Sequence, residues 1–258
     1  MPSPRQPAAP DLRLEGGTVH VWHIPLGLPA PLLKRLYSTL SPGEQQRCDR
    51  LRSETLKQRF VASHGLLRKV LGGYLQTDPA QLVFSPGRTG KPSLSSSAPG
   101  FQFNISHSGD LALYAVSREL TVGIDLEKIR PVQNLTPLTK RYFTPAEHSA
   151  INSLPPDERE KAFFKAWVLK EAYVKATGEG LAGLHGLEVS CSGSCGVPAP
   201  LILKDRPGKA SPAWSALSFE PSPGYVAALV VEGGHFRAIH CHEGPDISTA
   251  DDQPGRRD

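Results

Sequence analysis

Cysteine is scarce in this sequence, with four among 258 residues: Cys48, Cys191, Cys195 and Cys241. Small secreted domains held together by disulfides carry a much denser set, so the sequence excludes a disulfide scaffold. Cys191 and Cys195 have a spacing that some zinc sites use, but no second Cys/His pair of matching spacing follows. We therefore do not expect a structural zinc site.

Long apolar runs are also missing. The longest, Tyr225 to Val231, is too short to cross a bilayer, so we expect no membrane segment. The first residues lack the apolar core and cleavage pattern of a secretory signal, and we expect a cytoplasmic protein. Residues 1–16 and 243–258 are rich in Pro, Ala, Gly or Asp and are predicted to be disordered tails, and 205–222 a loop.

The sequence also lacks a strong net charge of either sign. The net charge of +4 and the pI near 8.9 fall short of the domain-wide excess of a dedicated nucleic-acid binder, yet they favour an anionic partner. Hydrophobic content of 39% and charged content of 21% are those of a globular protein. The length is sufficient for two lobes that each bury a core.

Two short acidic stretches stand out from this background. Residues 122–127 read as a strand, in which Asp125 and Glu127 leave the same face because they are two positions apart. Residues 167–175 read as a helix, in which Trp167, Glu171 and Lys175 recur every four residues and share one face. Three carboxylates could thus converge, and oxygen ligands of this kind suit Mg²⁺.

Each acidic stretch also has an ordinary structural interpretation. Asp125 and Glu127 could simply end a strand in solvent. Glu171 could pair with Lys175 as a helix-surface couple at i, i+4. Taken separately, neither stretch decides between these interpretations and a metal site.

The chain also repeats itself at an offset of 103 residues. Thr18-Val19 falls on Thr121-Val122, and Ser41-Pro42-x-Glu44 falls on Thr144-Pro145-x-Glu147. The order strand (19–24), helix with a Ser-Pro start, and long amphipathic helix (56–74) recurs in the second half. We therefore predict an α+β fold of two similar lobes, 17–120 and 121–242, related by internal duplication about a pseudo-twofold axis.

The two lobes differ where the acids lie. At the positions of Asp125, Glu127 and Glu171 the first half has Trp22, Ile24 and Arg68. Only the second lobe can therefore hold a metal ion. The cleft between the lobes is the expected site, and the first lobe is free to supply cations for phosphate.

The acidic stretches together resemble the signature of the 4'-phosphopantetheinyl transferases. Gly-Ile-Asp-x-Glu is followed about forty residues later by Trp-x-x-Lys-Glu-Ala-x-x-Lys, and residues 176–181 are similar to the ending of the surfactin-synthetase-activating, pseudodimeric class. The resemblance spans about residues 19–232. It implies Mg²⁺-dependent transfer of the phosphopantetheine arm of coenzyme A to a serine hydroxyl of acyl or peptidyl carrier proteins, with release of adenosine 3',5'-bisphosphate.

The resemblance also implies roles for the acidic residues. Asp125, Glu127 and Glu171 would hold Mg²⁺, with Asp125 also contacting the coenzyme, and Glu171 would take the proton of the attacking serine. Lys175 would stabilise charge on the pyrophosphate, with Lys170 as the weaker candidate for the same task. Trp167 is expected in the core or the cleft wall.

Further residues are implied as coenzyme A contacts. Lys91, in a Gly-Lys-Pro turn, and Ser106 and His107, in the string Phe-Asn-Ile-Ser-His-Ser, match family motifs that bind phosphate. Arg47, in the basic run after Ser41, matches a family residue whose positive charge contacts the 3'-phosphate of coenzyme A. A neighbouring family lysine falls on Glu44, and we expect Arg59 to substitute for it.

Two other functions are compatible with the acids. A Mg²⁺-dependent phosphodiesterase or nuclease uses a similar triad, but it needs stacking aromatic residues along a basic groove, which the sequence does not show. The second alternative is a protein that binds carrier proteins without catalysing a reaction. The presence of Asp125, Glu127 and Glu171 together argues against it. We expect a monomer that binds no nucleic acid and serves fatty-acid, polyketide or nonribosomal peptide synthesis.

Overall fold

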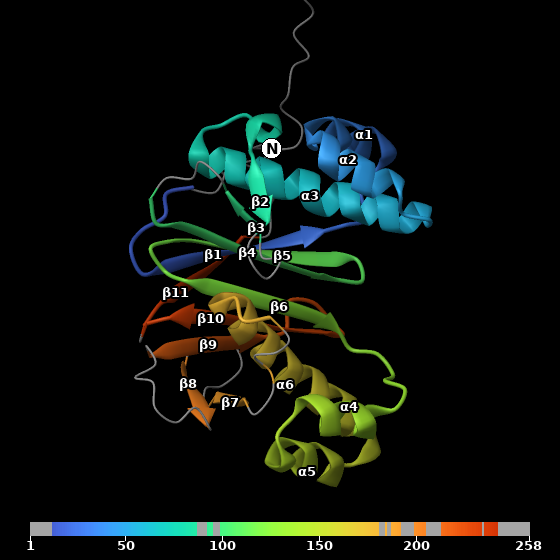
Figure 1. Cartoon of the computed structure of the whole chain (residues 1–258), viewed down its shortest axis with the longest axis vertical. Coiled ribbons are helices and arrows are strands. Elements are labelled where there is room, and N and C mark those ends of the chain that lie inside the picture. Colours follow the sequence, from blue (N-terminus) through green and yellow to red (C-terminus); the bar gives the residue numbers. More distant parts are fainter. Residues whose placement is uncertain are drawn as a thin grey trace, which may run out of the picture.

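Two β-sheets lie face to face at the centre of the molecule, with helices on the outer face of each (Figure 1). The computed structural model describes residues 12–86, 92–94, 99–180, 184, 187–191, 199–204, 213–233 and 235–241. Apolar residues from both sheets make the shared core, among them Val21, Leu113, Ile124 and Leu229. The fold is mixed α+β, as predicted.

The first sheet has the order β11-β1-β5-β4 and is covered by the N-terminal helices (Figure 1). The predicted long helix 56–74 is confirmed as α3 and buries its apolar side on the sheet. The elements of this part are β1 (Thr18–Pro25), α1 (Ala30–Thr39), α2 (Pro42–Asp49), α3 (Glu54–Leu75), the 3₁₀ helix η1 (Pro79–Gln81), β2 (Phe84–Pro86), β3 (Pro92–Leu94), β4 (Phe101–Ser108) and β5 (Leu111–Arg118).

The second sheet has the order β6-β10-β9-β8-β7, and α6 packs on its outer face. The prediction of a loop over 205–222 is wrong for 214–219, which form β9 between β10 and β8. The elements are β6 (Val122–Lys128), α4 (Leu135–Tyr142), α5 (Pro145–Ser153), α6 (Pro156–Thr177), β7 (Glu188–Cys191), β8 (Ala199–Lys204), β9 (Trp214–Phe219) and β10 (Tyr225–Glu232).

The last strand, β11 (Arg237–Cys241), crosses from the second half of the chain to the first sheet. It pairs in parallel with β1, with Thr18 opposite Arg237 and Trp22 opposite Cys241. His23 and His240 extend this contact through a 2.8 Å hydrogen bond between Nε2 and Nδ1. The predicted lobe 121–242 therefore gives its final strand to the other sheet.

Two short helices begin with the same capping arrangement. At α2 the Ser41 hydroxyl accepts from the backbone of Glu44, whose carboxylate returns to the Ser41 backbone. At α5 Thr144 and Glu147 repeat this reciprocal pair. Both helices have Pro in the first turn, where a missing N–H costs nothing. The Ser/Thr-Pro-x-Glu motif therefore explains both starts.

Gly123 sets the distance between β6 and α6. A Cβ at this position would overlap the carbonyl oxygen of Ala172 and the backbone nitrogen of Ala176. The helix backbone therefore lies directly on the strand, as only a glycine permits. Because Asp125 and Glu127 leave the strand on the same face as Gly123, the close contact brings the helix to the acids.

No helix in the described ranges is long and apolar enough to cross a membrane. The predicted tail over 243–258 and most of that over 1–16 lie outside the described residues.

Candidate functional site

Asp125 is the buried centre of the acidic site. Its Oδ1 lies 2.6 Å from Lys175 Nζ and accepts a 2.9 Å hydrogen bond from the Ser106 hydroxyl. Its Oδ2 is buried and has no hydrogen-bond partner among the described residues. Burial raises the pKa of this carboxyl, and the nearby Lys175 opposes the shift.

Glu171 faces the same place from α6. It is half-buried, and the described residues offer it no hydrogen bond or ion pair. Burial raises its pKa, and the negative charge of Asp125 and then of Glu127 adds to the shift, while Lys175 opposes it. The three predicted acids are thus close enough to repel one another, as acids that share a cation do.

Glu127 lies at the outer end of the site. Its Oε2 accepts from the Ser108 hydroxyl at 2.9 Å and from Arg130 Nη1 at 3.0 Å. The Arg130 guanidinium also lies over the Phe164 ring, with Cζ 5.1 Å from its centroid. Glu127 is therefore fixed in place by a strand on one side and an exposed arginine on the other.

The residues present fit a divalent cation by their chemistry. Oxygen donors from two carboxylates on β6 and one on α6 are the hard ligands that Mg²⁺ prefers, and Asp125 Oδ2, which has no hydrogen-bond partner among the described residues, is available to a cation. In the described part of the chain, however, no group of three His, Cys, Asp or Glu side chains has the spacing that holds a metal ion.

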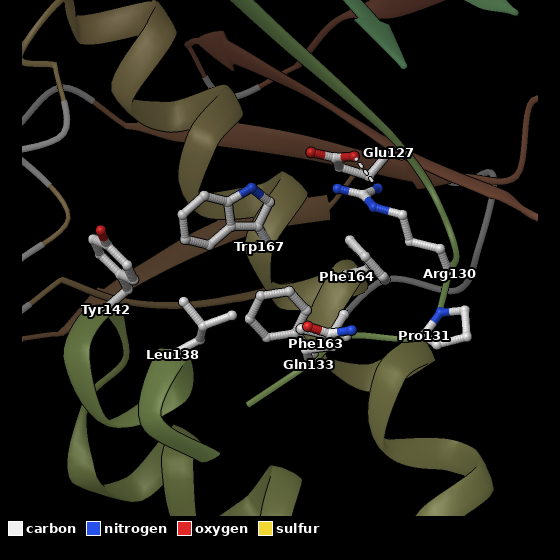
Figure 2. A pocket seen from close by; sticks show the side chains of 10 residues that line it. Glu127, Arg130, Pro131, Gln133, Leu138, Tyr142, Phe163, Phe164 and Trp167 are labelled. Carbon is white, nitrogen blue, oxygen red and sulfur yellow. Dashed lines mark hydrogen bonds and ion pairs between the residues drawn. The ribbon is translucent and has the colours of Figure 1, made fainter. Parts of the chain in front are cut away.

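An apolar pocket of about 310 Å³ opens beside Glu127 (Figure 2). Trp167 stands in its wall, as predicted, stacked on Phe163 and edge-on to Tyr142. Because Trp167, Glu171 and Lys175 follow one face of α6, this face leads from the pocket past the acid to the amine. The residues around the pocket are Glu127, Arg130, Pro131, Val132, Gln133, Leu138, Tyr142, Phe163, Phe164 and Trp167.

Basic side chains from both halves of the chain lie near the acids. His107 is exposed, its pKa lowered by partial burial and by the positive charges of Lys175 and Arg47, although Glu127 acts in the opposite direction. Arg47 lies over the ring of Phe60, which stacks on His64. The structure therefore gathers Arg47 and His107 from the first half of the chain near Lys175 from the second.

The structure places the other predicted cations differently. Arg59 forms a 2.6 Å ion pair with Asp110 in the turn between β4 and β5. Lys91 lies outside the described residues. The Ser106 hydroxyl donates to Asp125 and accepts from Leu126 N–H and Lys175, so its one donor and both acceptor positions are in use. In this arrangement Ser106 supports Asp125 and has no donor left for phosphate.

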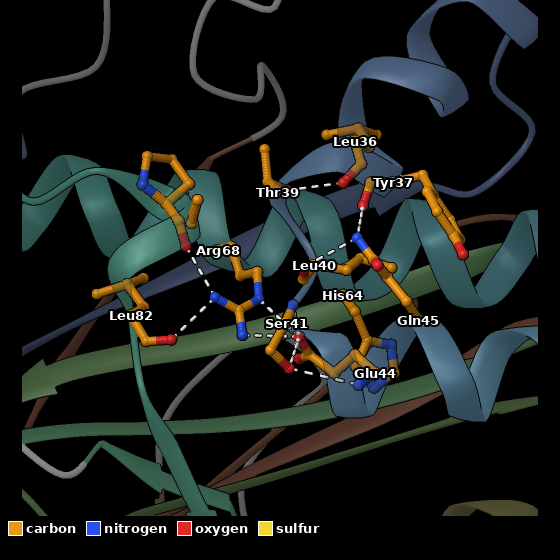
Figure 3. Close-up of polar contacts among 12 residues, drawn as sticks. Leu36, Tyr37, Thr39, Leu40, Ser41, Glu44, Gln45, His64, Arg68 and Leu82 are labelled. Atoms are coloured by element: carbon orange, nitrogen blue, oxygen red, sulfur yellow. Dashed lines mark hydrogen bonds and ion pairs between the residues drawn. The ribbon is translucent and has the colours of Figure 1, made fainter.

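Glu44, which occupies the position of a family lysine, has a structural role (Figure 3). Its Oε2 lies 2.6 Å from the guanidinium of Arg68, a side chain that is 1% exposed. Although burial alone raises its pKa, hydrogen bonds from Arg68 and Ser41 bring it below the ordinary value. Arg68 also donates to the carbonyls of Pro79 and Leu82.

Lys170 makes the same kind of contact in the second half. Its side chain is 0% exposed, and Nζ lies 2.7 Å from Glu147 and donates to the carbonyls of Tyr142 and Leu187. A lysine enclosed in this way has no donor directed at the acids. The structure therefore assigns Lys170 to the core and corrects its prediction as a coenzyme contact.

Sequence reasoning missed Asn104, Ser108, His64 and Arg130. Asn104, Ser106 and Ser108 alternate along β4, and this alternation predicts one shared face, with His107 on the other. His64 lies four residues after Phe60 on α3, a spacing that predicts contact. The sequence offers no comparable signal for Arg130, because its contact with Glu127 depends on the course of the chain after β6.

Comparison with known proteins places the chain among transferases. The sequence profile of the 4'-phosphopantetheinyl transferase superfamily matches residues 121–230, and that of the 4'-phosphopantetheinyl transferase N-terminal region matches residues 30–119.

Individual relatives agree with these profiles. The chain is 42% identical over 229 residues to the 4'-phosphopantetheinyl transferase HetI of Nostoc sp., covering 88% of this chain and 93% of that protein. It is 32% identical over 149 residues to the 4'-phosphopantetheinyl transferase Sfp of Bacillus subtilis, covering 58% and 65%. It is 33% identical over 152 residues to the L-aminoadipate-semialdehyde dehydrogenase-phosphopantetheinyl transferase of Xenopus laevis, covering 55% and 50%.

Proposed function

Because this chain belongs to the 4'-phosphopantetheinyl transferase superfamily, we propose that it transfers the 4'-phosphopantetheine arm of coenzyme A to a serine hydroxyl of acyl or peptidyl carrier proteins. One structural observation carries the proposal. Glu171 on α6, which has no hydrogen bond or ion pair among the described residues, lies near Asp125 and Glu127 on β6, and Glu127 borders the apolar pocket. Acids next to an apolar pocket offer a place to a metal-bound phosphate with an apolar arm.

Asp125, Glu127 and Glu171 would hold Mg²⁺ in this site. When bound, the ion supplies positive charge that neutralises the pyrophosphate of coenzyme A and polarises the bond to be broken. The mutual repulsion of the acids and the unpartnered Oδ2 of Asp125 support this assignment. Waters and phosphate oxygens usually complete the shell of Mg²⁺, so three carboxylates suffice.

The phosphates of coenzyme A would contact the cations beside the acids. Arg47 and His107 come from the first half of the chain and Lys175 from the second, and burial and then the charges of Lys175 and Arg47 lower the pKa of His107. A bound phosphate would offset this repulsion. The neighbourhood of Arg47 and His107 supports their predicted role, and Lys91 remains a prediction for the same group.

The apolar pocket would receive the arm itself. It begins at Glu127 and is walled by aromatic and aliphatic side chains, including Trp167 and Phe163. A pantetheine chain buries hydrocarbon against such walls, and only a few polar groups are needed to orient it. The arm would therefore extend from the acids along α6 towards Trp167.

In the transfer step, the carrier serine oxygen attacks the β-phosphorus, and the bond from this phosphorus to the oxygen of adenosine 3',5'-bisphosphate breaks. Glu171 is the carboxylate free to take the serine proton, directly or through a water, because the described residues give it no other partner. Lys175, held by Asp125, Ser106 and the Ile124 carbonyl, would stabilise charge on the phosphates.

We also infer that the two halves arose by duplication. The pairing of β1 with β5 corresponds to that of β6 with β10: Pro25 lies opposite Leu111, and Lys128 opposite Tyr225. The buried cations Arg68 and Lys170 each pair with the glutamate of a capping box. Their offset is 102, since 170 − 68 = 102, so Lys170 rather than Glu171 corresponds to Arg68. With both lobes in one chain, a cytoplasmic monomer would build the whole cleft.

The decisive experiment is incubation with coenzyme A, Mg²⁺ and an unmodified carrier protein, followed by mass spectrometry of the carrier. We expect a gain of one phosphopantetheine arm at one serine and an equal amount of adenosine 3',5'-bisphosphate. Cleavage of a nucleic acid or of coenzyme A without transfer would favour a phosphodiesterase. Tight carrier binding without a mass change would favour a non-catalytic homologue.

A further inference from the structure

Strands β4 and β6 are joined by a row of side chains. The backbone N–H groups of Ile124, Leu126 and Lys128 donate to Asn104 Oδ1, Ser106 Oγ and Ser108 Oγ at 2.8, 3.2 and 3.1 Å, respectively. These N–H groups lie on the edge of β6 that does not pair with β10. Without the β4 side chains, the inner two would be buried donors without a partner, which is costly.

Two members of this row also bind the acids. The Ser106 hydroxyl donates to Asp125 Oδ1 and the Ser108 hydroxyl donates to Glu127 Oε2, each at 2.9 Å. The same oxygens also accept from a cation, Lys175 for Asp125 and Arg130 for Glu127. Each acid therefore has one oxygen held by a serine and a cation, and the serines follow one strand with the spacing of the acids on the other.

The second carboxylate oxygen of each acid lacks such contacts among the described residues. Asp125 Oδ2 is buried without a hydrogen-bond partner in the described ranges, and the contacts found there for Glu127 all involve Oε2. A carboxylate fixed through one oxygen cannot rotate freely, so the direction of the other oxygen is set in advance. Each serine is itself fixed by the β6 N–H that it accepts.

We infer that Ser106 and Ser108 are positioning residues, which orient Asp125 and Glu127 so that the second oxygen of each is presented to a divalent cation. This inference rests on the proposed function, since it assumes that the acids hold Mg²⁺. It assigns to Ser106 a role different from phosphate binding, and it assigns a role to Ser108, for which the sequence predicted none. Groups that orient metal ligands commonly change metal affinity 10–100-fold when they are removed.

Ser108 is the better position for a test. Ser106 contacts Lys175 as well as Asp125, so its removal changes two partners. Ser108 is only half-buried and contacts the acid and one N–H at the end of β6. The loss of its hydroxyl should therefore leave the fold intact.

The experiment measures Mn²⁺ binding to the full chain without coenzyme A, by electron paramagnetic resonance of the free ion, so that no turnover is needed. We expect Ser108→Ala to weaken Mn²⁺ binding about tenfold. Ser108→Thr, which keeps the hydroxyl, should bind within about twofold of the unsubstituted protein. The matched control is Ser63→Ala, because the Ser63 hydroxyl is buried and has no hydrogen-bond partner in the described part of the chain.

Further variants separate the two hypotheses. If Glu127→Ala abolishes Mn²⁺ binding but Ser108→Ala binds like the unsubstituted protein, the positioning role is wrong and the metal site stands. If Glu127→Ala binds Mn²⁺ unchanged, the metal site of the proposed function is wrong and the inference falls with it. If urea unfolding shows that Ser108→Ala does not fold, Ser108→Cys, with a weaker donor of similar size, must show the same loss.

Discussion

The amine of Lys175 lies 2.6 Å from Oδ1 of Asp125, and the other oxygen of this buried carboxylate has no hydrogen-bond partner among the described residues. Only one of the two carboxylate oxygens of Asp125 therefore has a hydrogen-bond partner in the described part of the chain. A lysine from α6 satisfies one oxygen, and the charge of Asp125 also acts on Glu171 on the same helix.

Glu171→Gln should lower the rate of transfer roughly 10²–10⁴-fold, because the amide cannot accept the proton of the carrier serine. Stability should rise slightly, since Glu171 has no hydrogen bond or ion pair to lose within the described ranges and the substitution removes a half-buried charge that Asp125 and Glu127 repel. Single-turnover transfer and urea unfolding measure the two effects. Glu160→Gln on the same helix is the control, and a Glu171→Gln protein that keeps most of its rate at saturating Mg²⁺ would exclude Glu171 as the base.

Gly123→Ala should destabilise the protein by about 1–3 kcal/mol and reduce transfer, because the new methyl overlaps the backbone of α6 at Ala172 and Ala176. The helix must shift away from β6, which separates Glu171 from Asp125. Thermal unfolding and the steady-state rate measure both effects. Gly43→Ala is the matched control, because a Cβ there meets nothing within 4 Å. Unchanged stability and rate for Gly123→Ala would show that the helix does not depend on this contact.

Trp167→Ala should raise the KM for coenzyme A about tenfold or more, while the affinity for adenosine 3',5'-bisphosphate, which has no arm, stays the same. The substitution removes a large part of the pocket wall beside Phe163 and Tyr142. Isothermal titration with the bisphosphate and steady-state kinetics with coenzyme A separate the two effects. An equal loss for both ligands would mean that the pocket does not hold the arm.

Lys170→Ala should destabilise the protein by about 3–5 kcal/mol, because it leaves Glu147 without its buried partner. The folded fraction should keep the KM of the unsubstituted protein for coenzyme A, since Lys170 is enclosed in the core. Urea unfolding at low temperature measures the loss of stability, and steady-state kinetics on the folded protein measure the KM for coenzyme A. A variant of normal stability with a raised KM would instead restore Lys170 as a coenzyme contact.

Acid should destabilise the fold through His64. Burial lowers its pKa from 6.5 to about 4, with Arg47 and His107 adding to the shift and Glu44 and the Phe60 carbonyl opposing it. Between these two pH values the unfolded chain binds a proton that the folded protein does not, so stability falls as the pH falls, by at most about 1.4 kcal/mol per pH unit. Urea unfolding from pH 7 to pH 4 should give a shallower slope for His64→Phe than for the control His235→Gln.

The elements that carry the site could be predicted because each has a local cause. The alternation of side chains predicted the strand over 122–127, and the Ser/Thr-Pro-x-Glu motif predicted the starts of α2 and α5. Strand β9 was not predicted, because Pro, Gly and Ser around it have turn propensity, and its pairing with β10 overrides that preference.

The partners of individual side chains were harder to predict. Lys170 and Glu171 are neighbours in sequence but point roughly 100° apart on a helix, so one is enclosed in the core and the other faces the acids. The roles of Ser106 and Ser108 depend on β4 meeting β6, which belong to different sheets. Contacts of this kind follow from the packing of the whole chain, and no local pattern predicts them.

The parallel pairing of β11 with β1 has a consequence for dissecting the molecule. A polypeptide ending near residue 120 would leave β1 as an open edge strand, which favours aggregation. A polypeptide starting near residue 121 would carry β11 without its sheet. The boundary between the two halves is thus a poor place to cut the gene, and soluble fragments should form only when both are produced together.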